Sequence, residues 1–262
     1  MKQSDYETIR IDRRGRVLTL TMNRPDVLNA VSARLHTELS QVFYDAARDP
    51  ESDVIVLTGA GRAFCAGGDV DWMQAAIDDP DTFETTVTEA KAIVFSLIEC
   101  EKPTIARING PAVGLGATLA LFCDVSFAAE TAYLSDPHVS IGMVAGDGGA
   151  VIWPQLIGFA RAKEFLFTGD RIDARRAAEI GLINRCVPAA ELDATVDAFA
   201  DRMVNGATKA IRWTKVTTNI ALKQLAASMM DVGLAYEALT NVSKDHRDLV
   251  DRFRARAAKG KA

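Results

Sequence analysis

His138 and Asp147 lie on either side of a glycine-bearing loop, and their residue types are those of an acid–base pair. Histidine has an ordinary pKa near 6.5, so its ring exchanges protons close to neutral pH. An aspartate hydrogen-bonded to one ring nitrogen fixes the tautomer and stabilises the imidazolium, while the other nitrogen faces water or an acidic C–H group. The alternative is that His138 caps a loop and Asp147 caps a helix that begins near Gly148.

Two glycine turns offer backbone donors for a negatively charged oxygen. One turn spans residues 64–69 and the other residues 109–116, and each is predicted to lie between a strand and a helix. Glycine lets the backbone turn sharply and approach a ligand, and N–H groups at a helix start have no partner within the helix. Two such turns side by side predict an oxyanion hole. Taken singly, each is also compatible with a simple turn.

Other polar residues are predicted to have structural roles. His36 and His246 are expected on the surfaces of helices, and Asp69 is expected to cap or orient the segment that follows the first glycine turn. The four cysteines are scattered without close pairing, at Cys65, Cys100, Cys123 and Cys186. This spacing predicts no metal site and fits a reducing cytoplasm better than a disulfide framework.

Alternating strands and helices must position these residues. The predicted strands are 7–12, 17–22, 54–57, 104–108 and 125–128, and the predicted helices are 32–48, 82–101 and 116–122. This order predicts an α/β domain. No dinucleotide-binding or P-loop glycine motif occurs, which excludes those two classes. Beyond Pro188 only helical apolar stripes remain, so we expect a core over residues 1–190 and a helical region over residues 191–262.

Composition places the chain among ordinary globular proteins. Its 262 residues are 48% hydrophobic and 25% charged, with a formal net charge of −5. These values exclude a disordered chain, a collagen-like repeat and a coiled-coil rod. The acidic balance argues against a nucleic-acid partner, and no apolar run is long enough to span a membrane.

Four sequence blocks resemble the crotonase (enoyl-CoA hydratase/isomerase) superfamily. They are residues 23–30, 63–69, 103–124 and 168–184, in the family's order. The resemblance implies a spiral core of repeated ββα units and a helical C-terminal trimerisation region, with a trimer or a dimer of trimers as the assembly. It also implies acyl-CoA substrates, with coenzyme A as part of the substrate and no further cofactor. The family stabilises a thioester enolate with two backbone N–H groups, here those of Gly68 and Leu115.

The resemblance also implies substrate contacts at Arg24, Arg62, Ala66 and Trp72. It breaks down, however, at the two glutamates with which the family's hydratases activate water and deliver a proton. The corresponding residues here are Thr118 and His138, and threonine is a poor acid or base near neutral pH. We therefore expect no two-glutamate hydratase mechanism, and we assign the acid–base role to His138 with Asp147.

The stretch from His138 to Asp147 resembles 6-oxocamphor hydrolase, a crotonase relative that cleaves a carbon–carbon bond of a cyclic β-diketone. There a histidine and an aspartate at this spacing activate water. A further histidine of that hydrolase has no counterpart in residues 113–118. Three functions remain open: an acyl-CoA enzyme, a β-diketone hydrolase that needs no coenzyme A, and an acyl-CoA binding protein without activity.

Overall fold

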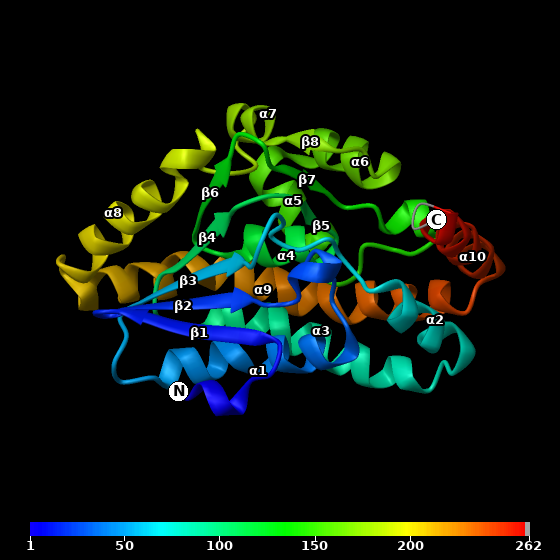
Figure 1. Cartoon of the computed structure of the whole chain (residues 1–262), viewed down its shortest axis with the longest axis horizontal. Coiled ribbons are helices and arrows are strands. Elements are labelled where there is room, and N and C mark those ends of the chain that lie inside the picture. The colour runs from blue at the N-terminus through cyan, green and yellow to red at the C-terminus, as the bar shows by residue number, and fades with distance from the viewer. Residues whose placement is uncertain (260–262) are drawn as a thin grey trace.

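A six-stranded sheet forms the centre of the computed structural model, which describes residues 1–259 (Figure 1). Its strand order is β1-β2-β3-β4-β6-β9. The strands are β1 (Ile9–Arg14), β2 (Val17–Met22), β3 (Val54–Gly59), β4 (Thr104–Ile108), β6 (Val125–Ala129) and β9 (Arg185–Val187). β1 is antiparallel to β2, and every other neighbouring pair is parallel. The first two strands form a hairpin, and the later strands are connected through helices, as parallel pairing requires.

A second, three-stranded sheet lies beside the first and positions the segment that contains His138. It contains β5 (Ala112–Val113), β7 (Tyr133–Ser135) and β8 (Ile172–Asp173) in the order β5-β7-β8. β4 and β5 lead into α4 (Leu115–Phe122), and β6 and β7 lead through the 3-10 helix η3 (His138–Ile141) towards α5 (Gly149–Ile157). The chain therefore repeats a ββα pattern, and the connections that lead into α2 (Val70–Asp78), α4 and α5 carry the glycine-bearing segments singled out in the sequence.

Both faces of the central sheet are buried, as its continuous apolar runs predict. In β3, Ile55 and Leu57 face one core, while Val54 and Val56 face a second, smaller core. Side chains alternate between the two faces of a strand, so one apolar run supplies both. α8 (Leu192–Val204) covers the smaller core with Leu192, Val196 and Ala200.

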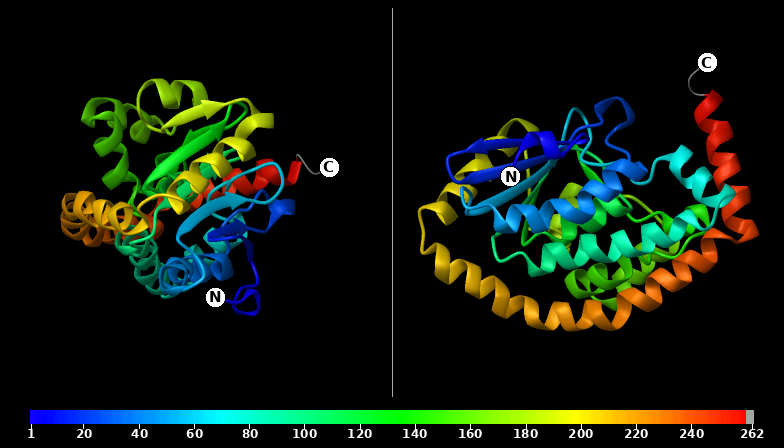
Figure 2. Two further views of the ribbon diagram at one scale, coloured as in Figure 1. Left: turned by 90° about the vertical axis from the view of Figure 1, so that its left-hand side faces the viewer. Right: turned by 90° about the horizontal axis from the view of Figure 1, so that it is seen from below.

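Helices surround the sheets. The larger core is covered by α1 (Ala33–Arg48) and α3 (Thr82–Glu99), and the remaining helices are α2 (Val70–Asp78), α6 (Phe159–Thr168), α7 (Ala174–Glu179), α9 (Thr208–Asn241) and α10 (Lys244–Lys259). Short 3-10 helices lie at Gln3–Asp5 (η1), Pro25–Val27 (η2) and Ala189–Glu191 (η4). The long helix α9 runs along one side of the molecule, at the lower edge of the right-hand view in Figure 2, and α10 turns back at its end to lie beside α2.

The predicted α/β class and the helical C-terminal region are confirmed. All eight predicted elements are present within a few residues, and the Ser32 side chain caps α1 by accepting a hydrogen bond from the N–H of Leu35. Two expectations stay predictions. One is the division of the chain into a core over residues 1–190 and a helical region over residues 191–262, and the other is assembly as a trimer or a dimer of trimers. Among the described residues, no helix combines the length and the apolar character needed to cross a membrane.

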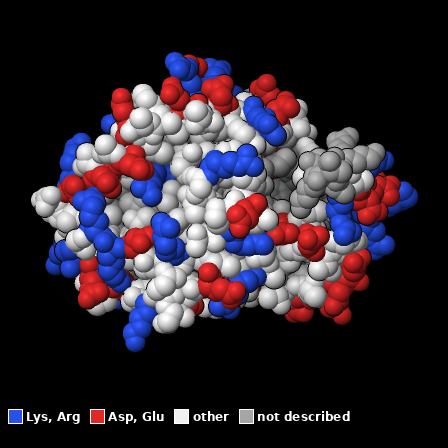
Figure 3. Space-filling view, viewed as in Figure 1, with Lys and Arg blue, Asp and Glu red and all other residues white. Residues whose placement is uncertain are grey.

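Charges are mixed on the face of the molecule drawn in Figure 3. There, Lys and Arg are intermingled with Asp and Glu over the described residues, in keeping with the modest net charge of −5. A protein that binds nucleic acid usually gathers its basic residues into one patch or stripe. The face shown has no such concentration among the residues described.

Candidate active site

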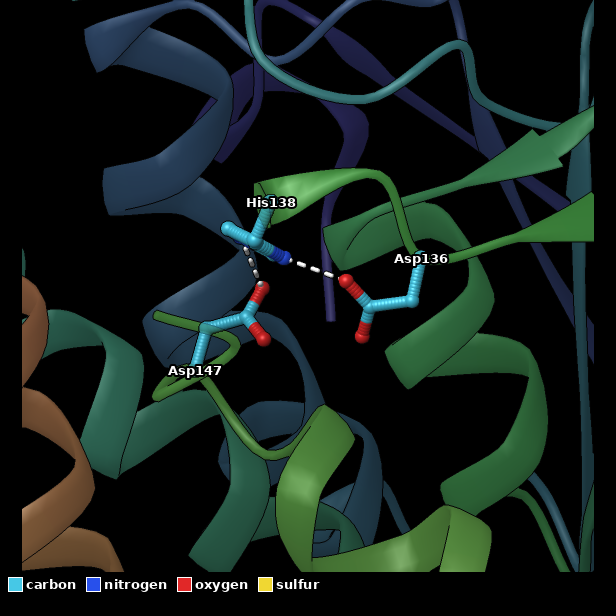
Figure 4. Close-up of side chains that lie close together, drawn as sticks. All are labelled: Asp136, His138 and Asp147. Carbon is cyan, nitrogen blue, oxygen red and sulfur yellow. Dashed lines mark hydrogen bonds and ion pairs between the residues drawn. The ribbon is translucent and has the colours of Figure 1, made fainter. Parts of the chain in front are cut away.

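The side chain of His138 lies between two aspartates (Figure 4). His138 begins η3, directly after Pro137, where the chain leaves the second sheet. Its Nδ1 lies 2.5 Å from Oδ1 of Asp136, and its Nε2 lies 3.7 Å from Oδ2 of Asp147. Only 12% of the His138 side chain is exposed, and both carboxylates are buried. The predicted pair is thus brought together as part of a group of three.

The roles of the two aspartates differ from the prediction. Asp147 was expected to fix the histidine tautomer, but its distance of 3.7 Å is beyond hydrogen-bond range. Asp136 makes the short contact with Nδ1 and is therefore the carboxylate that orients the ring. The sequence did not single out Asp136, because the path of the chain through Pro137 decides where its carboxylate points.

The two aspartates favour the charged form of His138. Burial by itself lowers the pKa of a histidine, but the negative charges of Asp136 and Asp147 outweigh it and raise the pKa of His138 well above 6.5. The two aspartates therefore stabilise the imidazolium, which is the form of the ring that can donate a proton. Burial raises the pKa of Asp147, opposed by the positive charge of His138, so this carboxylate is a stronger base than an exposed aspartate.

Asp147 is held by two neighbours. The hydroxyl of Thr118 donates to its Oδ1 at 3.3 Å, and the N–H of Gly149 lies 3.4 Å from the same oxygen. The expected helix does begin at Gly149, but Gly148 rather than Asp147 holds the N-cap position. Thr118, expected to be inert as an acid or base, has a positioning contact with the acid–base group.

Glu237 is a further acid in the site that the sequence analysis missed. It lies on α9 and is buried, and its Oε2 has no hydrogen-bond partner among the described residues. Burial raises the pKa of Glu237 to about 8, opposed by His138 and assisted by Asp147. Its carboxyl group is therefore mostly protonated at pH 7. No sequence signal links it to the loop of His138, because 99 residues separate them and only the fold brings them together.

The two glycine turns meet next to His138. A Cβ atom on Gly67 would lie 3.3 Å from the carbonyl oxygen of Val113, so the first turn touches the second. A Cβ atom on Gly114 would lie 3.8 Å from both Cα of Gly67 and Cε1 of His138. Gly67 and Gly114 have φ angles of 90° and 53°, which glycine adopts without strain. The two glycine turns therefore lie side by side, as predicted.

The two predicted oxyanion donors are unpaired in the described part of the chain. The N–H groups of Gly68 and Leu115 donate to no backbone or side-chain acceptor there, whereas those of Ala66, Asp69 and Gly114 donate to carbonyl oxygens. Leu115 is the first residue of α4, where a backbone N–H has no intrahelical partner. Both groups are thus available to a ligand oxygen.

Metal binding is an alternative use of the cluster formed by Asp136, His138 and Asp147. They offer one ligand atom each, all within 4.8 Å of one another. However, Nδ1 of His138 and Oδ1 of Asp136 are 2.5 Å apart, which is a hydrogen-bond distance. Two ligands bound at about 2.1 Å around a tetrahedral metal lie farther apart than this. The contact between Nδ1 and Oδ1 therefore has the geometry of a hydrogen bond, and the absence of a metal stays a prediction.

The predicted substrate-binding residues have different environments. Arg24 is tied to the fold, because its guanidinium donates to Oδ2 of Asp69 at 3.0 Å and to the carbonyl oxygen of Ala30. Arg62 is exposed and lies two residues before the first glycine turn, and Ala66 is half-buried within that turn. Trp72 is half-buried on α2. Substrate contacts at these four positions stay predictions.

The prediction that His36 and His246 are surface residues is wrong. His36 is 2% exposed, because Nδ1 pairs with Oε2 of Glu89 on α3 at 2.6 Å and its ring packs on Trp72 with centroids 5.0 Å apart. His246 is fully buried at the start of α10, with Nδ1 2.5 Å from the carbonyl oxygen of Ile141. By contrast, Asp69 caps α2 as predicted, accepting from the N–H of Asp71.

Replacing Asp136 by Asn is expected to change the pH dependence of catalysis. The change removes a negative charge beside Nδ1, so the pKa of His138 falls towards 6.5. The imidazolium is present below that pKa and lost above it, so the alkaline fall in kcat/KM moves to lower pH. Profiles for the wild type and for Asp136→Asn measure this shift, and Asp12→Asn on the exposed hairpin is the matched control. An unmoved alkaline limb would count against the assignment.

Comparison with known proteins places the chain in a family. The family description enoyl-CoA hydratase/isomerase matches residues 12–253. A probable enoyl-CoA hydratase of Mycobacterium bovis is 35% identical over 233 residues, covering 88% of this chain and 87% of that protein. A crystal structure of an enoyl-CoA hydratase/isomerase from Mycobacterium paratuberculosis superposes with a TM-score of 0.91 at 38% identity, covering 95% of this chain and 99% of that one.

A third similar protein has a different activity. It is a β-diketone hydrolase from the cyanobacterium Anabaena, solved with (S)-3-oxocyclohexyl acetic acid bound. Its TM-score is 0.85 at 29% identity, and the match covers 91% of this chain and 96% of that one. The fold thus serves more than one reaction, and the reaction must be argued from the site. With its family match over most of its length, the chain belongs to the enoyl-CoA hydratase/isomerase family of the crotonase superfamily.

Proposed function

We propose that this protein is an acid–base enzyme that acts on an acyl-CoA thioester through an enolate. The observation that carries the proposal is the closeness of the second glycine turn to the first turn and to His138, since a Cβ atom on Gly114 would lie 3.8 Å from both Cα of Gly67 and Cε1 of His138. This closeness supports a site in which His138 lies beside the N–H groups of Gly68 and Leu115, which have no acceptor among the described residues. Enolate chemistry needs this combination, because charge develops on the carbonyl oxygen while a proton moves at the neighbouring carbon.

In the proposed mechanism, the N–H groups of Gly68 and Leu115 hold the thioester oxygen. The carboxylate of Asp147 takes a proton from the substrate or from water, and the imidazolium of His138 gives one back. Asp136 keeps the ring oriented and favours its charged form before the proton is donated. Burial raises the pKa of Asp147 towards neutral pH, which makes this carboxylate a better base, while the two aspartates stabilise the imidazolium that serves as the proton donor.

Coenzyme A as the carrier is inferred from the relatives. The Mycobacterium bovis protein is a probable enoyl-CoA hydratase, and its match covers most of both chains. In this chain, Arg62 is exposed beside the first glycine turn, where a guanidinium can meet a phosphate. Arg24 is less suited to that contact, because Asp69 already occupies its guanidinium.

A substrate panel tests the proposal. Purified protein is mixed with crotonyl-CoA, longer 2-enoyl-CoA and 3-enoyl-CoA thioesters, and cyclic β-diketones without coenzyme A. We expect hydration or a shift of the double bond in at least one thioester, seen as a change in the absorbance of the conjugated enoyl group. The diketones are expected to stay intact. Turnover of a diketone with no turnover of any thioester would replace the proposal by its alternative.

That alternative, hydrolysis of a carbon–carbon bond in a β-diketone, has one specific observation in its favour. A histidine between two carboxylates, with a neutral carboxyl group nearby, suits a reaction in which water attacks one carbonyl and the departing enolate takes up a proton. The Anabaena protein with this activity shares the fold. Release of acid in the diketone arm of the panel would identify this reaction.

A binding protein without activity is the remaining possibility. Such a protein would keep the free N–H groups of the two turns but would have no use for a charged histidine between buried aspartates. Buried carboxylates are costly unless they are paired or protonated. If no compound in the panel is turned over while a non-reactive acyl-CoA still binds, the enzymatic proposal is overturned.

A further inference from the structure

The loop between His138 and Asp147 lies against the C-terminal helices. Gly146 packs so closely on Gly233 of α9 that a Cβ atom on Gly146 would overlap the carbonyl oxygen of Gly233. The N–H of Val144 donates to the hydroxyl of Thr240, also on α9, at 3.3 Å. The helical region after residue 191 therefore contacts the loop that carries the acid–base residues.

The start of α10 continues this contact at η3. Gly142 ends η3 with φ of 72°, and a Cβ atom there would lie 2.9 Å from the backbone N of His246. The side chain of His246 reaches the same 3-10 helix, since Nδ1 lies 2.5 Å from the carbonyl oxygen of Ile141. Ile141 is the last residue of η3, and a carbonyl group at a helix end lacks an intrahelical partner.

The burial of His246 suggests more than packing. The ring is fully buried, and Nε2 has no hydrogen-bond partner among the described residues. A leucine would fill such a site without leaving a buried ring nitrogen unsatisfied, which costs roughly 1–3 kcal/mol. The one polar contact that the histidine gains in return is the bond to η3. Because a carbonyl oxygen accepts at Nδ1, the proton of the neutral ring lies on that nitrogen.

We infer that His246 is a positioning residue of the acid–base site: it anchors η3 through Ile141 and thereby holds the ring of His138 between Asp136 and Asp147. This inference rests on the role proposed for His138. A four-residue 3-10 helix has poor internal hydrogen-bond geometry, so it needs an external anchor. A shift of about 1 Å in a catalytic group can lower the rate by about 100-fold.

Three substitutions distinguish the effect of the hydrogen bond between His246 and Ile141 from the effect of the packing of the His246 side chain. His246→Asn keeps an amide N–H near the position of Nδ1, His246→Gln moves the amide to the position of Nε2, and His246→Leu removes all polar atoms. We expect His246→Leu and His246→Gln to lower kcat by about 10- to 100-fold with KM nearly unchanged, and His246→Asn to keep most of the wild-type kcat.

Two further measurements exclude a general loss of stability. Val250→Ala, which removes buried volume from the same helix, is expected to lower Tm without lowering kcat. Amide hydrogen exchange of residues 138–142 is expected to rise in His246→Leu and His246→Gln but not in His246→Asn. The alkaline limb of the pH profile is expected to shift only in the first two, because the ring of His138 leaves Asp136.

Equal loss of kcat in the Asn, Gln and Leu variants, or loss in none of them, would overturn the inference. If His246→Leu does not fold, the comparison of Asn with Gln still decides the question, since both keep a polar side chain. Failure of the proposed function is recognised separately. In that case His138→Ala keeps full turnover, while hydrogen exchange still reports whether His246 holds η3.

Discussion

Replacement of His138 by alanine is expected to lower kcat by about 100- to 10,000-fold while KM changes little. The variant loses the imidazolium that stands 2.5 Å from Asp136 and faces Asp147 through its other nitrogen. Proton transfer by a placed side chain typically contributes an effect of this size. The measurement is steady-state turnover of the best thioester from the panel.

A control variant distinguishes loss of the proton donor from loss of the volume that the His138 side chain fills. His138→Gln keeps a polar side chain of similar length but cannot exchange a proton, so its kcat is expected to fall about as far as that of His138→Ala. Binding of a saturated acyl-CoA is expected to survive in both. Full activity in His138→Ala would mean that Glu237 or another group carries the proton.

Replacement of Leu115 by proline is expected to lower kcat by about 100- to 1,000-fold. The change deletes one oxyanion donor, since proline has no backbone N–H. It is compatible with the fold because Leu115 is the first residue of α4, a position that proline favours in helices. The loss is expected in kcat more than in KM, because charge builds up on the oxygen during the reaction.

Leu115→Ala is the matched control for this donor. It removes the buried side chain but keeps the N–H, so its kcat is expected to stay within a few-fold of the wild type. Circular dichroism and Tm report whether α4 is intact in both variants. If the alanine and proline variants lose the same activity, the side chain matters rather than the backbone donor, and the oxyanion assignment at Leu115 is wrong.

The elements that the sequence predicts well are those with a strong local signal. β3 begins with the unbroken apolar run 54–57, β4 is a largely buried run preceded by Pro103, and α1 has Ser32 as its N-cap and an apolar stripe that faces the core. A helix was expected after the first glycine turn, with Asp69 capping or orienting the segment, but the bounds of α2 were not predicted. Its nine residues are too few to show a clear helical period, and its partners on α3 and α10 come from distant parts of the chain.

The centre of the candidate site, the closeness of His138 and Asp147, was predicted, but its surroundings were not. His138 and Asp147 could be found because they share one loop and have chemically apt side chains. Glu237 and the anchor His246 lie on separate helices, so their contacts depend on how the C-terminal region packs on that loop. The prediction that His36 is exposed was wrong for a similar reason, because its partner Glu89 belongs to another helix.

Exchange of the hydrogens next to the thioester is the most direct test of the central claim, which is that the site forms an enolate by proton transfer. A saturated acyl-CoA matched to the best enoyl substrate is incubated with the enzyme in D2O, and deuterium at the carbon next to the thioester is followed by NMR. We expect exchange with the wild type, and exchange lowered at least 100-fold in both His138→Ala and Leu115→Pro. Absence of exchange with an enzyme that still turns over the enoyl-CoA, or equal exchange in the wild type and His138→Ala, would contradict the account.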